Sequence, residues 1–177
     1  MALKSTSSPI VISTAFTQGT NNAFNVQQVD LQLNPLDQEV FVVTAVAIDF
    51  TGMPFPETEL SGQTLQSKYE VSVCKSRPPS FQGLESSNCI AIERLITLNS
   101  FLTGTNKNVA IYNSTPLDTP PSQLDYLDII ATDSFFIAMD GSNTLGPSSG
   151  AVRIFGYRAR ADSATYAALV QSEMLSA

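Results

Sequence analysis

Paired carboxylates are the residues whose types and spacing come nearest to catalytic chemistry. Asp125 and Asp128 are three positions apart, and Glu57 and Glu59 are two apart. Two such groups could carry out glycoside hydrolysis, although acidic residues most often lie in solvated loops. The sequence contains no His, which excludes Ser-His-Asp and Cys-His sites within one chain and imidazole metal ligands. We therefore expect no catalytic centre and no enzymatic activity.

Metal and modification sites are equally sparse. Asp140 and Asn143 could offer oxygen ligands to Ca²⁺, or form a turn from ordinary turn residues. Cys74 and Cys89 do not match a zinc site; they could face each other across a hairpin, or stay as inert thiols. Asn113 begins a glycosylation sequon that Pro116 follows, so we discount it. The sequence thus predicts no cofactor and no tightly bound transition metal.

The overall charge is low and negative. Charged residues make up 14% of the 177 residues, against roughly 25% in an average soluble protein. Depletion of charge is typical of protein–protein interfaces, although a secreted β-domain with a neutral polar surface would also fit. The net charge of −7 argues against binding of nucleic acid by the whole surface.

Charge is distributed unevenly along the chain. No Lys or Arg lies between Ser5 and Ser67. The acids of that stretch are Asp30, Asp37, Glu39, Asp49, Glu57 and Glu59, and three arginines near the end are Arg153, Arg158 and Arg160. These arginines could bind phosphate, or pair with acids within or between subunits. We expect them near a subunit boundary.

The first residues, MALKSTSSPIVIS, do not have the pattern of a signal peptide, because the apolar run is short and β-branched. No apolar run approaches the ~20 residues that span a bilayer. We therefore expect no transmembrane segment and synthesis in a cytoplasm.

The stretch from Glu39 to Phe50 predicts a central strand, because β-branched residues dominate it and both of its faces are apolar. A buried helix is the alternative. One alternating set is expected to face the main core: Val40, Val42, Thr44, Val46, Ile48 and Phe50. Of these, Val42, Val46 and Ile48 should be nearly fully buried.

Seven further segments have strand character, and Pro, Gly and Asn separate them. With Glu39–Phe50, the eight candidates are Pro9–Phe16, Val26–Leu33, Lys68–Lys75, Cys89–Leu98, Lys107–Asn113, Leu127–Met139 and Ala151–Ala159. Two hairpins are expected, one joining the second candidate along the chain to Glu39–Phe50 and one joining the last two. Eight antiparallel strands predict an all-β sandwich of the jelly-roll type, with an immunoglobulin-like sandwich as the alternative. Residues 1–8 should form a flexible arm, and residues 9–177 a single domain.

A short C-terminal helix is predicted over residues 162–175, capped by Asp162 or Ser163. One apolar stripe follows helical spacing: Tyr166, Leu169, Val170 and Met174. This stripe requires a partner. We expect it to cover the second face of Glu39–Phe50 or to lie in a subunit interface.

The C-terminal sequence VRIFGYRARADSATYAALVQSEML (residues 152–175) is similar to the ends of structural proteins predicted in marine bacterial or archaeal viruses. The Ser/Thr-rich arm, the strand count, the low charge and the Pro-rich loops resemble single jelly-roll coat proteins of viruses. The resemblance implies a capsid subunit that is made in the host cytoplasm, self-assembles into a homo-oligomeric shell and contacts other virion proteins. Direct contact with nucleic acid is not expected, because the arm carries only Lys4.

Two alternatives remain open. One is a viral decoration or tail component. The other is a lectin-like carbohydrate-binding module, in which Tyr112, Tyr126 and Tyr157 could stack on sugar, although these side chains would also suit a subunit interface.

Overall fold

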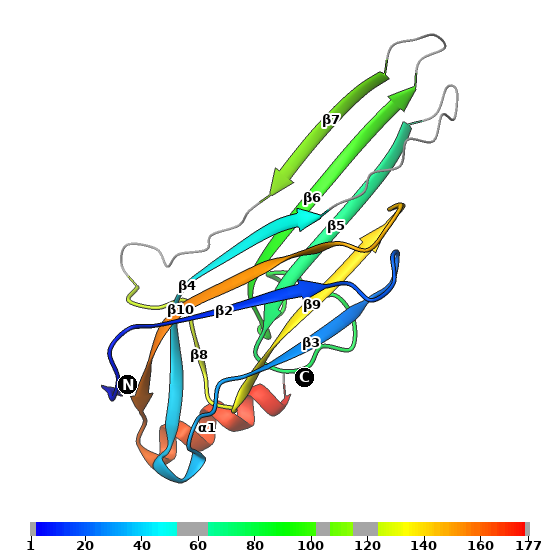
Figure 1. Ribbon diagram of the computed structural model, residues 1–177. Coiled ribbons are helices and arrows are strands. Elements are labelled where there is room, and N and C mark those ends of the chain that lie inside the picture. The colour runs from blue at the N-terminus through cyan, green and yellow to red at the C-terminus, as the bar shows by residue number, and fades with distance from the viewer. Residues whose placement is uncertain (1–2, 53–63, 102–106, 115–123, 176–177) are drawn as a thin grey trace.

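The computed structural model describes residues 3–52, 64–101, 107–114 and 124–175, which form two antiparallel β-sheets and one α-helix (Figure 1). Sheet A contains β1 (Lys4–Ser5), β2 (Ile10–Thr17), β4 (Glu39–Gly52), β8 (Asp128–Ile130) and β10 (Ser149–Arg160). Sheet B contains β3 (Asn25–Asp30), β5 (Thr64–Cys74), β6 (Cys89–Phe101), β7 (Lys107–Ser114) and β9 (Ser134–Ser142). A 3-10 turn, η1 (Pro35–Asp37), precedes β4, and helix α1 (Ser163–Leu175) follows β10.

The strand order is that of a jelly roll. Sheet A runs β2-β10-β4-β8 and sheet B runs β3-β9-β5-β6, so the chain passes repeatedly between the sheets and forms two Greek keys. The described residues contain two strands besides the eight of the jelly roll. β1 pairs with β10 beyond the end of β2, and β7 pairs with β6 at the outer edge of sheet B. The predicted β-sandwich with a C-terminal helix is confirmed.

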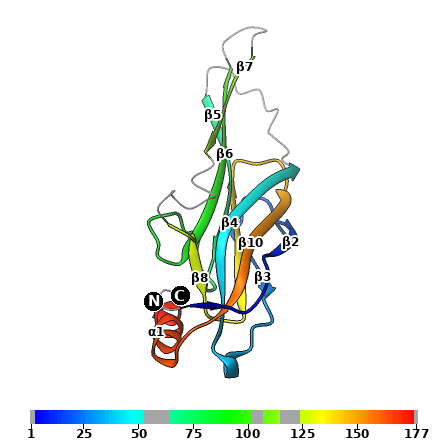
Figure 2. The same ribbon diagram turned by 90° about the vertical axis from the view of Figure 1, so that its left-hand side faces the viewer.

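The main core lies between the two sheets. Its largest buried side chains include Phe16 and Phe41 from sheet A and Phe135 and Ile137 from sheet B. Figure 2 shows the sheets edge-on, with β5, β6 and β7 extending well beyond sheet A and with α1 at the opposite end. In the part of the chain described here, no helix has the length and apolar character needed to cross a membrane.

Strand β4 is interior to sheet A as predicted. The set of side chains predicted to face the main core is correct after residue 44 and wrong before it. A β-bulge leaves Thr44 without a register partner, because Ala45 pairs with Phe155 while Val43 pairs with Gly156. An extra residue in one strand reverses which side chains face the core. Before the bulge Phe41 and Val43 face the main core, whereas after it Val46, Ile48 and Phe50 do.

The bulge also changes the expected burial. Val40 and Val42 lie in a second apolar cluster, on the outer face of sheet A. Val42 and Val46 are fully buried as expected, whereas Ile48 is only half-buried, so that part of the prediction was wrong.

The predicted strand Leu127–Met139 is two strands in different sheets. β8 pairs with β4, and β9 pairs with β3 and β5. The chain leaves the ladder between them, and there the N–H groups of Ala131 and Thr132 donate to the carboxylate of Glu173.

Both expected hairpins are also wrong. β3 lies in sheet B and β4 in sheet A, and the same separation applies to β9 and β10. The turn of Asn34, Pro35 and Leu36 forms as a cap and a 3-10 turn, in which Asn34 Oδ1 accepts the N–H of Leu36 at 3.1 Å. It connects the sheets and does not join neighbouring strands.

Part of the expected N-terminal arm is ordered against β10. Lys4 and Ser5 pair with Arg160 and Ala159, and the N–H of Thr6 donates to the carbonyl of Arg158. Leu3 packs against the outer apolar cluster of sheet A. Within the predicted arm, β1 thus supplies backbone partners along an edge of β10 that β2 does not reach.

Candidate functional site

Helix α1 begins at a side-chain cap. The carboxylate of Asp162 accepts the N–H of Thr165 at 2.9 Å and its hydroxyl at 2.8 Å. These hydrogen bonds, the backbone one first, lower the pKa of Asp162. The cap expected from the sequence is therefore Asp162, and it fixes where the helix leaves β10.

One side of α1 packs on the outer face of sheet A. Tyr166, Leu169 and Val170 are half-buried against a cluster of small and β-branched side chains. That cluster consists of Val40, Val42, Ile129, Ala131, Ala159 and Ala161. The helix thus covers the part of the second face of β4 that precedes the bulge, and most of the predicted stripe is used within the subunit.

A buried carboxylate fastens the C-terminal half of the helix. Glu173 is only 2% exposed and accepts the N–H groups of Ala131 at 2.6 Å and Thr132 at 3.0 Å. Burial raises the pKa of Glu173, while these hydrogen bonds and the charge of Lys75 oppose that rise. Glu173 was not among the predicted site residues. Its signal was the spacing, since Glu173 follows Leu169 by four residues on the packed side.

The raised pKa of Glu173 predicts a pH-dependent stability. Between its unfolded pKa, ~4.3, and its higher folded pKa, the folded chain binds a proton that the unfolded chain has released. The contribution of Glu173 to the free energy of unfolding is therefore largest at acidic pH and falls as the pH rises through this window. In Glu173→Gln this dependence should disappear, so the free energy of unfolding of the variant relative to that of the wild type, measured with denaturant, should increase as the pH rises above about 4.

Glu85→Gln is the matched control for this measurement. Glu85 is an exposed acid whose pKa is lowered by hydrogen bonds from its own N–H and from that of Gly83. The same substitution there should give a small change of opposite sign. If the difference between Glu173→Gln and the wild type does not change with pH, the buried carboxylate does not have the assigned effect.

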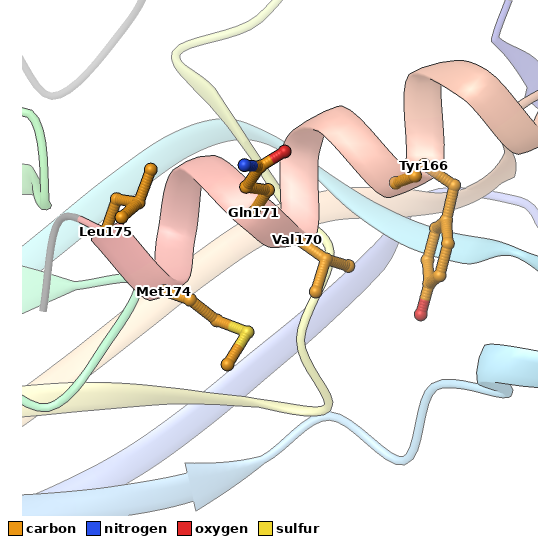
Figure 3. A pocket seen from close by; sticks show the side chains of 6 residues that line it. Tyr166, Val170, Gln171, Met174 and Leu175 are labelled. Carbon is orange, nitrogen blue, oxygen red and sulfur yellow. The ribbon is translucent and has the colours of Figure 1, made fainter.

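A flank of α1 next to its packed side carries exposed apolar side chains. Met174 is 72% exposed and Leu175 is 79% exposed. They help line a shallow hollow of about 560 Å³ along the helix (Figure 3). We call this lining the helix surface: Tyr166, Ala167, Val170, Gln171, Met174 and Leu175.

A second hollow, of about 190 Å³, shares Tyr166 and Val170 with the helix surface. It extends toward Leu33 and Pro35, beside the turn in which Leu36 is almost fully exposed. Exposed apolar side chains therefore lie at this end of the molecule on the helix and on the turn before β4. Exposed apolar side chains grouped in this way are a feature of contact sites.

The three predicted arginines do not form one group. Arg158 is used within the subunit, since its guanidinium lies 3.5 Å from the Glu39 carboxylate and donates to the carbonyl of Leu31 at 3.1 Å. Arg153 is exposed, and its Nε donates to the Ser13 hydroxyl at 3.2 Å. Arg160 is the last residue of β10 and is exposed. Of these three arginines, Arg153 and Arg160 therefore have an exposed guanidinium that a neighbouring subunit could contact.

The acids and thiols considered for chemistry lie apart or have structural partners. Asp128 pairs with Lys75 at 3.1 Å, while Asp125 is exposed in the preceding loop. Asp140 accepts the N–H of Gly141, and the amide of Asn143 donates to the carbonyl of Gln66, as in a turn. Glu57 and Glu59 lie outside the described residues, among which no group of three or more potential metal ligands occurs.

A buried ion cluster on sheet B was not anticipated. Glu70 is 3% exposed and forms ion pairs with Lys68 on its own strand and with Arg94 on β6, the second at 2.5 Å. The guanidinium of Arg94 also lies 5.7 Å from the ring centre of Phe81. The cluster joins β5, β6 and the loop between them, which is a structural role.

No known protein family matches the chain, and neither does any curated protein sequence. Among solved structures, the chain is similar to the Merkel cell polyomavirus VP1 unassembled pentamer, with 8% identity and a TM-score of 0.35. It is also similar to VP1 of the trichodysplasia spinulosa-associated polyomavirus, with 9% identity and a TM-score of 0.29. Each alignment covers 90% of this chain and 98% of the other. At these scores the likeness carries no argument, and the fold assignment depends on the strand order described above.

Proposed function

We propose that this protein is a structural subunit of a virion, a coat protein that self-assembles into a shell. The observation that carries the proposal is an exposed apolar helix surface on a jelly-roll subunit. Viral capsid proteins are among the main users of this fold, together with lectins. Copies of the same chain and other virion proteins would be its partners, and the virion its location after synthesis in a host cytoplasm.

The proposed occupant of the helix surface is a second copy of the chain. Burial of the exposed side chains of Met174 and Leu175 would supply affinity at roughly 1.5–3 kcal/mol each. Charge favours self-contact too, because the same subunit presents exposed Arg153 and Arg160 and exposed Asp30. Exposed ion pairs are worth only ~0–1 kcal/mol, so they would set orientation. A head-to-tail contact of this kind closes rings or extends lattices.

Assembly should depend on Met174. In Met174→Glu, a charge placed in the apolar contact should raise the subunit dissociation constant by about tenfold or more, since 1.4 kcal/mol corresponds to a factor of ten. The side chain is exposed, so the subunit should keep its fold and its melting temperature. Native mass spectrometry and light scattering across a range of concentration and salt would measure both effects, and negative-stain images would show the particle formed.

Leu145→Glu is the matched control, since Leu145 is 56% exposed in the loop between β9 and β10, far from the helix. Assembly that weakens equally in both variants would exclude the helix surface as the specific contact. A wild-type chain that stays monomeric under all conditions would exclude the shell and favour the lectin-like binding module.

A further inference from the structure

The two cysteines lie opposite each other at the end of the β5–β6 hairpin. Cys74 and Cys89 are register partners, next to a bulge that separates them from the pair Val73 and Ala91. The N–H of Cys89 donates to the carbonyl of Ser86, within the loop, at 3.1 Å. Opposed residues without mutual backbone hydrogen bonds have Cα atoms ~4.5 Å apart, and disulfides form at Cα separations of ~4.4–6.8 Å.

The loop that follows holds this end of the hairpin in place. Asn88 is fully buried, and its side chain accepts the N–H of Ser76 at 2.7 Å and donates to the carbonyl of the same residue at 3.0 Å. Its amide also donates to Gln82 at 2.9 Å. The N–H of Lys75 donates to the carbonyl of Asn88 at 3.0 Å. These contacts fix the residues next to both thiols, so closure of a bond between them requires little backbone movement.

The thiols are free and already in contact. A hydrogen bond between them lowers the pKa of Cys74 and raises the pKa of Cys89, and burial opposes the first shift and adds to the second. Cys74 is fully buried, whereas Cys89 is partly exposed. An external reagent therefore reaches Cys89 first, and Cys74 is placed to react second.

We propose that Cys74 and Cys89 close to an intrachain disulfide when the folded protein meets a small-molecule disulfide such as oxidised glutathione. Cys89 attacks the reagent while its proton passes to the Cys74 thiolate, forms a mixed disulfide and releases one glutathione thiolate. The Cys74 thiolate then attacks Sγ of Cys89, forms the internal bond and releases the second. Two cysteine thiols are oxidised, one glutathione disulfide is reduced, and the two cysteine protons pass to the released thiolates or to solvent.

The two thiols would stay reduced in a reducing cytoplasm and would form the disulfide outside it. Closure cross-links the ends of a short loop, residues 75–88, and restricts the unfolded chain. Loops of this size predict a rise in melting temperature of roughly 5–10 °C for a chain of this length. This inference is independent of the proposed assembly, because it concerns one folded subunit.

The test uses the full chain, fully reduced and then incubated with oxidised glutathione at about pH 8, where thiols begin to ionise. Intact mass should show the loss of two hydrogen atoms with no glutathione retained, and the melting temperature should rise. Dithiothreitol should reverse both changes. Wild-type protein that keeps two free thiols, or that retains glutathione on Cys89, would overturn the proposal, as would closure only in denaturant.

Single substitutions identify the order of events. Cys74→Ser should stop at a mixed disulfide on Cys89, whereas Cys89→Ser should leave the buried Cys74 unreacted in the folded chain. The reverse pattern would contradict the assigned roles. Because the wild-type mass measurement decides whether the bond forms, the proposal stays testable even if a substitution impairs folding.

Discussion

Val46→Asp is expected to abolish folding. Val46 is 1% exposed, lies in the core between the sheets and pairs in register with Ile154 at the centre of sheet A. An unpaired carboxylate at this position costs several kcal/mol, and the total stability of a domain is only ~5–15 kcal/mol. The circular dichroism spectrum should lose its β-sheet signal, and the cooperative thermal transition should disappear.

The adjacent position provides the control. Ala47 is exposed on the opposite face of β4 and is the register partner of Arg153. Ala47→Asp places the same charge one residue away, beside a cation, and should leave the fold intact. A cooperative transition in Val46→Asp within a few degrees of the wild type would mean that this part of β4 is not core.

Gly156→Ala is expected to give the second largest effect. Gly156 lies opposite the bulge in β4, and a Cβ atom there would stand 2.3 Å from the carbonyl oxygen of Val42 and 2.6 Å from the ring of Phe41. Neither neighbour can withdraw without disturbing the bulge or the core. Overpacking of this kind costs ~1–3 kcal/mol or more, and each kcal/mol lowers the melting temperature by roughly 2–4 °C in a chain of this length.

Gly141→Ala, in β9, is the appropriate comparison. A Cβ atom at Gly141 would meet its nearest neighbours at 3.5 Å, which is ordinary van der Waals contact. Its melting temperature should stay close to that of the wild type. Equal decreases in melting temperature in the two variants would show that loss of the conformational freedom of glycine, and not the close approach at the bulge, causes the destabilisation.

The same bulge explains which parts of the fold were predictable. The interior position of Glu39–Phe50 followed from its composition, but alternation assumes a regular strand, and one extra residue at Thr44 reversed the faces. Gly156, in the interior of a strand, was a visible signal for such an irregularity. The break within Leu127–Met139 coincides with the turn residues Thr132, Asp133 and Ser134, whereas the carboxylate that binds the freed N–H groups there comes from Glu173, about forty residues further along the chain.

The candidate site was predicted in outline. Helix boundaries depend on local capping, so the expected range of 162–175 differs by one residue from the observed Ser163–Leu175. Four residues of the apolar stripe were identified from spacing, but the sequence could not show which side of the helix sheet A would cover. The structure leaves Leu169 half-buried against sheet A and Met174 exposed, and it adds Leu175 and Gln171 to the exposed lining.

The position of β10 determines when sheet A can form during synthesis. β10 lies between β2 and β4, so a strand near the N-terminus and one from the first third of the chain must wait for residues 149–160. Pairings over such sequence separations carry a large loop-closure cost and are typical of slow folding. Until the ribosome has delivered the last strand, the apolar faces of β2 and β4 have no completed sheet. In this topology the nascent chain must keep the apolar faces of β2 and β4 from aggregating until residues 149–160 have been synthesised.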